Sequence, residues 1–199
     1  MAQDISRTGS ANGALRIPKA GRFDQVSLGF HWLTVLLVVG QFATAWWLSL
    51  GDQNAPLLLI VHRSMGTLTL VVVIGRLVWR HTCAHLPAFP DTMPMIQRRI
   101  AQANEFGLYA LLLLQPITGL GDTLFRAHDF ILFGLDVPPL VAKNKPLFQV
   151  LHTVHEYSAW TLLGLIGLHA GAALFHGLVL RDGVLERILP WTAKDPQQG

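Results

Sequence analysis

The residues with the clearest chemical potential in this sequence are its histidines. The chain has nine, a large number for so apolar a sequence. His81, His85 and His128 fall in the polar segments, and we interpret them as solvated loop residues. The other six lie in or beside apolar stretches: His31, His62, His152, His155, His169 and His176. A histidine in an apolar helix is costly unless it is paired or used, and a neutral imidazole is a common metal ligand.

Two of these histidines share one face of a single predicted helix. His155 and His169 are 14 residues apart. At 100° and 1.5 Å per residue, their directions differ by only about 40° and their heights by about 21 Å. His152 points about 100° away from His169 and does not share this face. Two metal-containing groups could therefore stack along the helix, one above the other.

Four apolar stretches must position these side chains. They cover residues 26–50, 57–79, 105–124 and 150–180, and each is long enough to cross a bilayer, which takes about 20 helical residues. Helix breakers separate the stretches, among them Pro56, Pro94 and Pro146. We find no convincing internal repeat. The pattern predicts an all-α membrane protein, a bundle of four transmembrane helices over residues 23–191, with a mobile N-terminal tail (1–22) and a C-terminal tail (192–199).

Composition supports lipid as the surrounding solvent. Apolar residues make up 51% of the chain and charged residues 14%, against about 25% charged in soluble domains. The pI is about 9.4, but the basic residues stand at the ends of apolar runs, which is typical of membrane topology and not of nucleic-acid binding. With Cys83 as the sole cysteine, the chain has no internal disulfide and no C-x-x-C-H motif for covalent haem attachment.

Lysine and arginine give the direction of the spans. Eleven of the fifteen fall on one side of the predicted membrane: Arg7, Arg16, Lys19, Arg22, Arg76, Arg80, Arg98, Arg99, Arg181, Arg187 and Lys194. The other side holds Arg63, Arg126, Lys143 and Lys145. By the positive-inside rule, both termini are cytoplasmic.

With this direction, the histidines fall at two matched heights. His31 near the start of the first helix lies at the level of His169, and His62 near the start of the second lies at the level of His155. Each pair joins two different helices, so each could bind one haem iron from both sides. We therefore predict two non-covalent b-type haems with the axial pairs His31–His169 and His62–His155. The alternative is that these are scattered core or interfacial histidines.

Short motifs accompany these residues along the chain. They are Leu28-Gly29-Phe30-His31-Trp32-Leu33, Ile60-Val61-His62-Arg63-Ser64-Met65-Gly66, Gly75-Arg76-Leu77-Val78-Trp79-Arg80, Leu108-Tyr109-Ala110-Leu111, Phe133-Gly134-Leu135, His155-Glu156 and Gly167-Leu168-His169-Ala170. In this order and spacing, the chain resembles the bacterial cytochrome b-561 family over roughly residues 22–191. The chain departs from some relatives at Asn104-Glu105, where they often have a histidine.

The resemblance implies a four-helix protein of the bacterial inner membrane. Carried over position by position, the family's haem ligands are His31, His62, His155 and His169, the set that the helix geometry also selects. A branch of the family oxidises superoxide on the periplasmic side and reduces ubiquinone, and we take this as the leading hypothesis. One alternative is an electron-transfer subunit that takes electrons from quinol and serves a partner redox enzyme. Another is a haem-free membrane transporter or scaffold. The expected partners are lipid, quinone, and superoxide or a redox protein, with no nucleic acid.

If superoxide is the donor, the outer surface should attract an anion. Arg63, Lys143 and Lys145, together with Arg126, are the candidates for this steering, and Arg63 could also pair with a haem propionate. Ordinary solvation of an outer loop is the alternative. The outer loop, about residues 123–149, is long enough to be functional, and its Phe130, Phe133 and Leu135 could lie over the outer haem.

Two polar residues, Gln41 and Glu156, are candidates for hydrogen bonds that support the haem ligands. The alternatives are a helix–helix hydrogen bond for Gln41 and an interfacial carboxylate for Glu156. Gln115 precedes Pro116 inside the third helix, which suggests a kink or a freed carbonyl.

Overall fold

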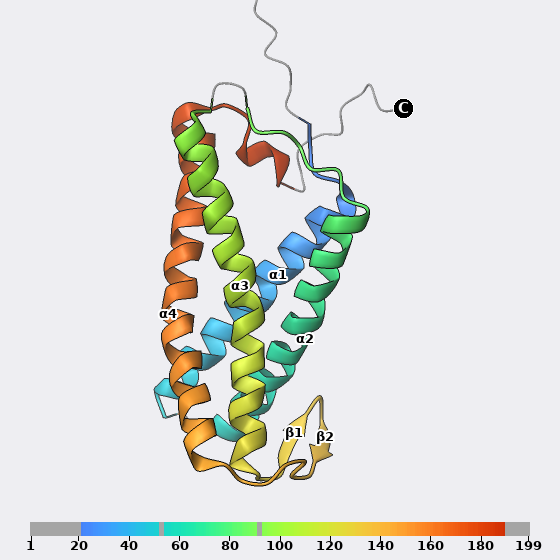
Figure 1. Cartoon of the computed structure of the whole chain (residues 1–199), viewed down its shortest axis with the longest axis vertical. Helices are drawn as coiled ribbons and strands as arrows, with labels where there is room; N and C mark the ends of the chain where they lie inside the picture. Colours follow the sequence, from blue (N-terminus) through green and yellow to red (C-terminus); the bar gives the residue numbers. More distant parts are fainter. Residues whose placement is uncertain (1–20, 52–53, 91–92, 190–199) are drawn as a thin grey trace, which may run out of the picture.

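Four long helices dominate the computed structural model, which describes residues 21–51, 54–90 and 93–189. They are α1 (Gln25–Ser49), α2 (Ala55–Thr82), α3 (Met95–Arg126) and α4 (Lys145–Phe175). Figure 1 shows them running together along the long axis of the molecule. All four are long and apolar enough to cross a membrane. The predicted all-α bundle of four membrane helices is confirmed.

The helices pack in chain order. Within the described residues, α1 packs against α2, α2 against α3, and α3 most closely against α4, whereas α4 is not packed closely against α1 or α2. One cluster of the buried core joins Val73, Leu112 and Leu162, one each from α2, α3 and α4. Most other large apolar side chains face outward, as expected where lipid is the solvent. Helix α4, which carries His155 and His169, is therefore held apart from α1 and α2, which carry His31 and His62.

The predicted boundaries were wrong at two helix starts. α3 begins at Met95, ten residues before the predicted start at 105, and α4 begins at Lys145 instead of 150. Polar residues can extend a helix beyond the lipid into water, so bilayer thickness does not limit its length. Pro56 and Pro146 stand in the first turn of α2 and α4, where their missing N–H costs nothing, and do not lie in the loops. The predicted link between the second and third spans, residues 80–104, is helical at both ends, because α2 runs to Thr82 and α3 begins at Met95. Most of the predicted tail 1–22 and all of the predicted tail 192–199 lie outside the described residues.

A β-hairpin stands at the end of the bundle that we call the outer end, after the predicted orientation. Its strands are β1 (Phe130–Leu132) and β2 (Leu135–Val137), paired antiparallel. The Phe133 N–H donates to the Ser64 hydroxyl of α2 at 2.9 Å. Phe130 is buried, but Phe133 and Leu135 are 56% and 71% exposed. Of these three residues, which we expected to lie over the outer haem, only Phe130 packs inward.

The opposite, inner end is closed by the segment that follows α4. A π-helical turn, η1 (His176–Leu180), is followed by the short 3-10 helix η2 (Leu185–Arg187). The Trp32 indole of α1 donates to the Ile188 carbonyl at 2.9 Å, and the Arg187 guanidinium donates to the Ala88 carbonyl at 2.7 Å. The side chain of Arg22 also donates to this segment, at the Leu189 carbonyl. These contacts fix the chain over the inner end of the bundle.

Asp24 caps α1 and ties it to α2. Its carboxylate accepts from the Ser27 N–H at 2.9 Å, the Ser27 hydroxyl at 2.7 Å and the Trp79 indole at 3.0 Å. Partial burial raises the pKa of the Asp24 carboxyl, but the hydrogen bonds outweigh it and hold the pKa below its ordinary value of 3.8. A depressed pKa means that the charged form stabilises the fold.

We expect Asp24→Ala to lower the free energy of unfolding by about 1 kcal/mol, because the cap is lost. In the unaltered protein, this stabilisation should be present above the ordinary pKa and should disappear as the pH falls below it. Thermal melts in detergent at several pH values measure both effects. Asp24→Asn is the control: it keeps the capping oxygen but cannot ionise, so its melting temperature should lack the acid-dependent part. Identical pH profiles for the unaltered protein and the Asp24→Asn variant would contradict this account.

Candidate functional site

The four predicted ligand histidines meet in two pairs. At the outer level, His62 of α2 faces His155 of α4, with ring centres 6.3 Å apart and ring planes at 83°. At the inner level, His31 of α1 faces His169 of α4, with ring centres 6.4 Å apart and planes at 48°. The neighbouring rings are those that the sequence analysis placed at matched heights, and their role as haem ligands stays a prediction. Each pair spans helices that do not pack directly on one another.

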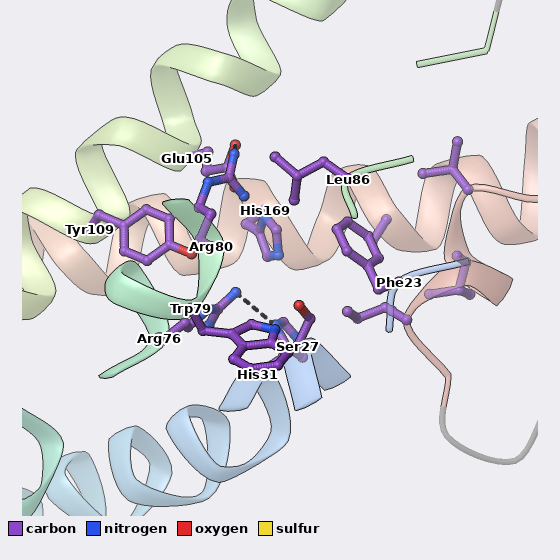
Figure 2. A pocket seen from close by; sticks show the side chains of 14 residues that line it. Phe23, Ser27, His31, Arg76, Trp79, Arg80, Leu86, Glu105, Tyr109 and His169 are labelled. Atoms are coloured by element: carbon purple, nitrogen blue, oxygen red, sulfur yellow. Dashed lines mark hydrogen bonds and ion pairs between the residues drawn. The ribbon is translucent and has the colours of Figure 1, made fainter. Parts of the chain in front are cut away.

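A cavity surrounds the inner pair. Figure 2 shows His31 and His169 pointing into it from opposite helices. Arg76, Glu105 and Tyr109 line it from α2 and α3. A second cavity adjoins the first and continues deeper into the bundle; its lining includes Thr34, Val38, Leu112, Leu162 and Ile166. The inner imidazoles therefore border a space that is polar toward the membrane surface and apolar toward the bilayer centre.

The ring of His62 is oriented by the first helix. Its Nδ1 lies 2.9 Å from the Thr44 hydroxyl oxygen. That hydroxyl also lies within hydrogen-bond distance of the Gly40 and Gln41 backbone carbonyls, so it can direct its single hydrogen at one of them and accept from Nδ1–H. This is the tautomer of His62 that leaves Nε2 with a free lone pair. The Gln41 side chain also donates to the His62 backbone carbonyl at 3.0 Å.

His155 receives matching support from the third helix. Its Nδ1 lies 3.0 Å from the Gln115 carbonyl oxygen and 3.2 Å from the Thr118 hydroxyl. A carbonyl can only accept, so His155 also carries its proton on Nδ1. The Gln115 side chain donates to the His155 backbone carbonyl at 3.0 Å and to the Ser158 hydroxyl at 2.6 Å. Gln115 is therefore a direct support of the His155 ring and not only the residue before Pro116.

Gly119 leaves the space that the His155 ring fills. A Cβ atom at this position would lie 3.0 Å from the imidazole Cε1 and 3.3 Å from Nδ1. Such contacts are tighter than ordinary van der Waals packing, so any larger residue must push the ring aside. By contrast, a Cβ on Gly164, Gly167 or Gly171 of α4 would meet nothing nearby. The glycine that matters for the histidine stands on the neighbouring helix.

The inner level is rich in charge. The Arg80 guanidinium forms an ion pair with Glu105 at 2.8 Å, and both Arg76 and Arg80 lie over the Tyr109 ring, at 5.3 and 5.9 Å from its centre. Arg76 Nη2 lies 3.4 Å from Nδ1 of His31, a long contact (Figure 2). Since arginine can only donate, it offers this ring no acceptor. The two cations are instead placed for an anionic group in the cavity.

The predicted anion-steering residues lie in different surroundings in the structure. Arg63 is half-buried beside His62, with its guanidinium 5.8 Å from the centre of the Phe130 ring. Arg126 is engaged by Asp122 at 2.9 Å. Lys143 and Lys145 are exposed and have no ion-pair partner in the described part of the chain. Only Arg63 stands close to a histidine pair. Glu156, a candidate support of the ligands, is exposed.

The paired imidazoles fit a haem iron. Two imidazoles on one metal ion, each bonded at about 2 Å, have their ring centres about 6 Å apart, close to the 6.3 and 6.4 Å observed. Two histidines are an incomplete ligand set for a bare transition metal, whereas a haem brings its remaining ligands with it. In the described ranges, no cluster of three or more His, Cys, Asp or Glu residues could hold a metal ion. The spacing and the free Nε2 atoms at the outer level both suit axial ligation.

Sequence reasoning missed several of the supporting residues. Thr44, Thr118 and Gly119 were not singled out, although the spacing Gln-x-x-Thr occurs in both supporting helices. Arg76 and Arg80 were treated only as topology signals, but their spacing of four residues places them on one helix face. That face is the one turned toward the inner histidine pair.

Comparison with known proteins agrees with this geometry. A family model described as prokaryotic cytochrome b561 matches residues 22–191. Cytochrome b561 homolog 1 of Escherichia coli (strain K12) is 28% identical over 174 residues, which cover 85% of this chain and 97% of that protein. The probable superoxide oxidase CybB of Yersinia pestis is 30% identical over 170 residues, 85% of this chain and 96% of that protein. Cytochrome b561 homolog 2 of E. coli is 30% identical over 181 residues, with 87% and 94% covered.

Proposed function

The chain belongs to the prokaryotic cytochrome b561 family, and from this premise we propose that it moves electrons between superoxide and ubiquinone through two b-type haems. Its general class, a multi-pass bacterial membrane protein of electron transfer with b-type haem, follows from the family and from the four apolar helices. The proposal adds the number of haems, their ligands and the two substrates.

The observation that carries the proposal is the presence of two histidine pairs at two heights, each with the ring spacing of axial ligands. His62 and His155 would hold the outer haem, and His31 and His169 the inner one. Arg63 at the outer level and Arg76 and Arg80 at the inner level are the cations available to haem propionates. Glu105, of the Asn104-Glu105 pair at which the sequence departs from some relatives, forms an ion pair with Arg80.

A haem supplies one-electron redox chemistry, and the chain supplies binding, orientation and surroundings. Paired imidazoles leave no position on the metal for a substrate, so this arrangement suits electron transfer and not oxygen activation. Thr44, Gln115 and Thr118 orient the outer rings. Val38, Leu112 and Ile166 keep the interior beside the inner pair apolar.

The distribution of Lys and Arg supports the orientation that we propose, with both termini in the cytoplasm. His62 and His155 then lie toward the periplasm of the inner membrane, and His31 and His169 toward the cytoplasm. Electrons entering at the outer pair would leave at the inner pair.

The proposed substrates are supported by one relative and by the local charge. The Y. pestis relative carries the name probable superoxide oxidase, and Arg63 places a cation beside the outer pair where an anionic donor would arrive. A subunit that takes electrons from quinol and serves a partner enzyme would use the same two haems. Kinetics with the purified protein therefore decide between the two functions.

The deciding experiment mixes the purified, oxidised protein with superoxide and follows the haem absorbance in a stopped-flow instrument. We expect rapid reduction by superoxide alone, followed by reoxidation when a ubiquinone analogue is added. A red protein that ignores superoxide but is reduced by quinol would support the partner-serving function instead. A colourless preparation would contradict both and favour a transporter or scaffold.

Arg63 should control the encounter with superoxide. We expect Arg63→Gln to lower the second-order rate constant for reduction by superoxide by about tenfold at low salt, and to weaken its dependence on ionic strength. The measurement is the same stopped-flow reaction at several salt concentrations.

Lys143→Gln is the matched control, because it also removes one outer positive charge but from an exposed side chain far along the loop. The Lys143→Gln substitution should change the rate constant for reduction by superoxide only slightly. Equal effects of the two substitutions would show that only the overall charge of the outer surface matters.

A further inference from the structure

The outer histidines are held by two hydrogen-bonding units of the same design. We call each unit a clamp: Gln41 and Thr44 of α1 form the clamp on His62, and Gln115 and Thr118 of α3 form the clamp on His155. In both, the glutamine side chain donates to the backbone carbonyl of the histidine at 3.0 Å. In both, the threonine hydroxyl, one helical turn later, lies beside Nδ1 of the same histidine. The two helical hairpins, α1–α2 and α3–α4, thus each contribute one clamp and one ring.

The clamps offer only acceptors to the rings. The Thr44 hydroxyl lies within hydrogen-bond distance of two backbone carbonyls, and so does that of Thr118. With its single hydrogen on a carbonyl, each hydroxyl accepts from the ring, and each Nδ1–H then donates outward to a neutral oxygen. Such a hydrogen bond raises the basicity of the imidazole and strengthens its bond to a metal. A more basic ligand favours the oxidised, more positive state of the iron.

The inner pair lacks clamps. Among the described residues, no hydrogen bond joins the His169 ring to an acceptor, and the hydrogen-bond contact of the His31 ring is with Arg76, which cannot accept. A cation stands near each pair, Arg63 near the outer one and Arg76 near the inner one. The hydrogen bonds to acceptors at Nδ1 are found at the outer level alone among the described residues.

We propose that the two Gln-x-x-Thr clamps are positioning units that lower the reduction potential of the outer haem below that of the inner haem, and so direct electrons inward. This inference rests on the proposed function, since it requires both haems. The step is a one-electron transfer in which the reduced outer haem is oxidised and the oxidised inner haem is reduced. No bond forms or breaks, and no proton moves in it.

The test is a spectroscopic redox titration of the purified protein with both haems bound. In the unaltered protein, we expect two potentials, with the lower one belonging to the outer haem. The His169→Ala variant assigns them, because it should keep only the outer potential. Thr44→Val, which removes the hydroxyl 2.9 Å from His62 Nδ1, should raise the outer potential. The equilibrium constant for transfer from outer to inner haem should fall about tenfold, which is about 59 mV for a one-electron couple.

The structure also predicts which variants should shift the outer reduction potential most. Thr118→Val should shift the outer potential less than Thr44→Val, because the Gln115 carbonyl still accepts from His155. Thr44→Ser restores the acceptor and should restore the potential. Thr161→Val, on the exposed surface of α4, is the matched control and should change neither potential. If Thr44→Val fails to hold the outer haem, Thr118→Val makes the same test with a smaller shift.

The outcomes separate this inference from the proposed function. A red protein with two haems whose potentials do not respond to Thr44→Val or Thr118→Val would overturn the clamps while leaving the proposed function intact. An outer potential above the inner one would also overturn them. A preparation without haem would instead end the proposed function on which they rest.

Discussion

Replacing His62 or His155 with alanine is expected to remove about half of the bound haem, because a haem held by paired imidazoles loses one of its two axial ligands. Haem binding at the inner level should be unaffected, since His31 and His169 lie far along the helices from the outer pair. The haem-to-protein ratio of each purified variant, from the absorbance of the reduced protein, measures the loss. His31→Ala and His169→Ala should each remove the half of the haem that is bound at the inner level.

His152→Ala is the control for this series. His152 lies on the same helix as His155, one turn away, but its side chain is exposed and contacts Asp122 at 3.6 Å. The His152→Ala variant should retain both haems. Full retention of haem in both His62→Ala and His155→Ala would contradict the proposed outer ligand pair.

The second large effect is expected at Gly119, a residue that touches no haem ligand by a polar contact. Gly119→Val adds a branched side chain where even a single Cβ would lie 3.0 Å from the His155 ring. Overpacking of this kind costs about 1–3 kcal/mol or forces the neighbour to move. We expect the ring of His155 to turn away from His62, with loss of most of the outer haem and retention of the inner one.

Gly164→Val provides the comparison, because a Cβ at Gly164 meets no atom within contact distance. Both substitutions place valine in a membrane helix, so any general effect of helix propensity is shared. The haem content and the absorbance spectrum of the two variants should differ sharply. Equal haem content in both would mean that the His155 ring can be accommodated elsewhere.

The heights and pairing of the histidines could be predicted because they depend on two regular quantities. One is the rise and twist of the helix, which places His155 and His169 on one face. The other is the thickness of the bilayer, which forces successive helices to alternate in direction and so brings His31 and His62 to opposite levels. The structure has both pairs together at similar ring spacing. That iron joins them stays a prediction.

The starts of α3 and α4 were not predictable in the same way. The segment from Met95 to Asn104 is polar enough to leave the membrane, yet it continues the helix into water. Hydropathy reports where the lipid ends and not where the backbone hydrogen bonds end. The steering residues show a related limit, because Arg63 and Lys143 are both on the outer side by charge counting, whereas only Arg63 lies next to a histidine.

The sequence by itself determined the class of the molecule and the two levels at which its four candidate histidines lie, because helix periodicity and the cost of charge in lipid act on each segment separately. Only the tertiary structure decided what surrounds those histidines. The sequence showed no convincing internal repeat, but the folded chain has the same clamp on two hairpins, and Gly119 leaves space for a ring that is 36 residues away in the chain. These contacts join different helices, and they depend on how the helices turn about their own axes when they pack, which no local pattern encodes.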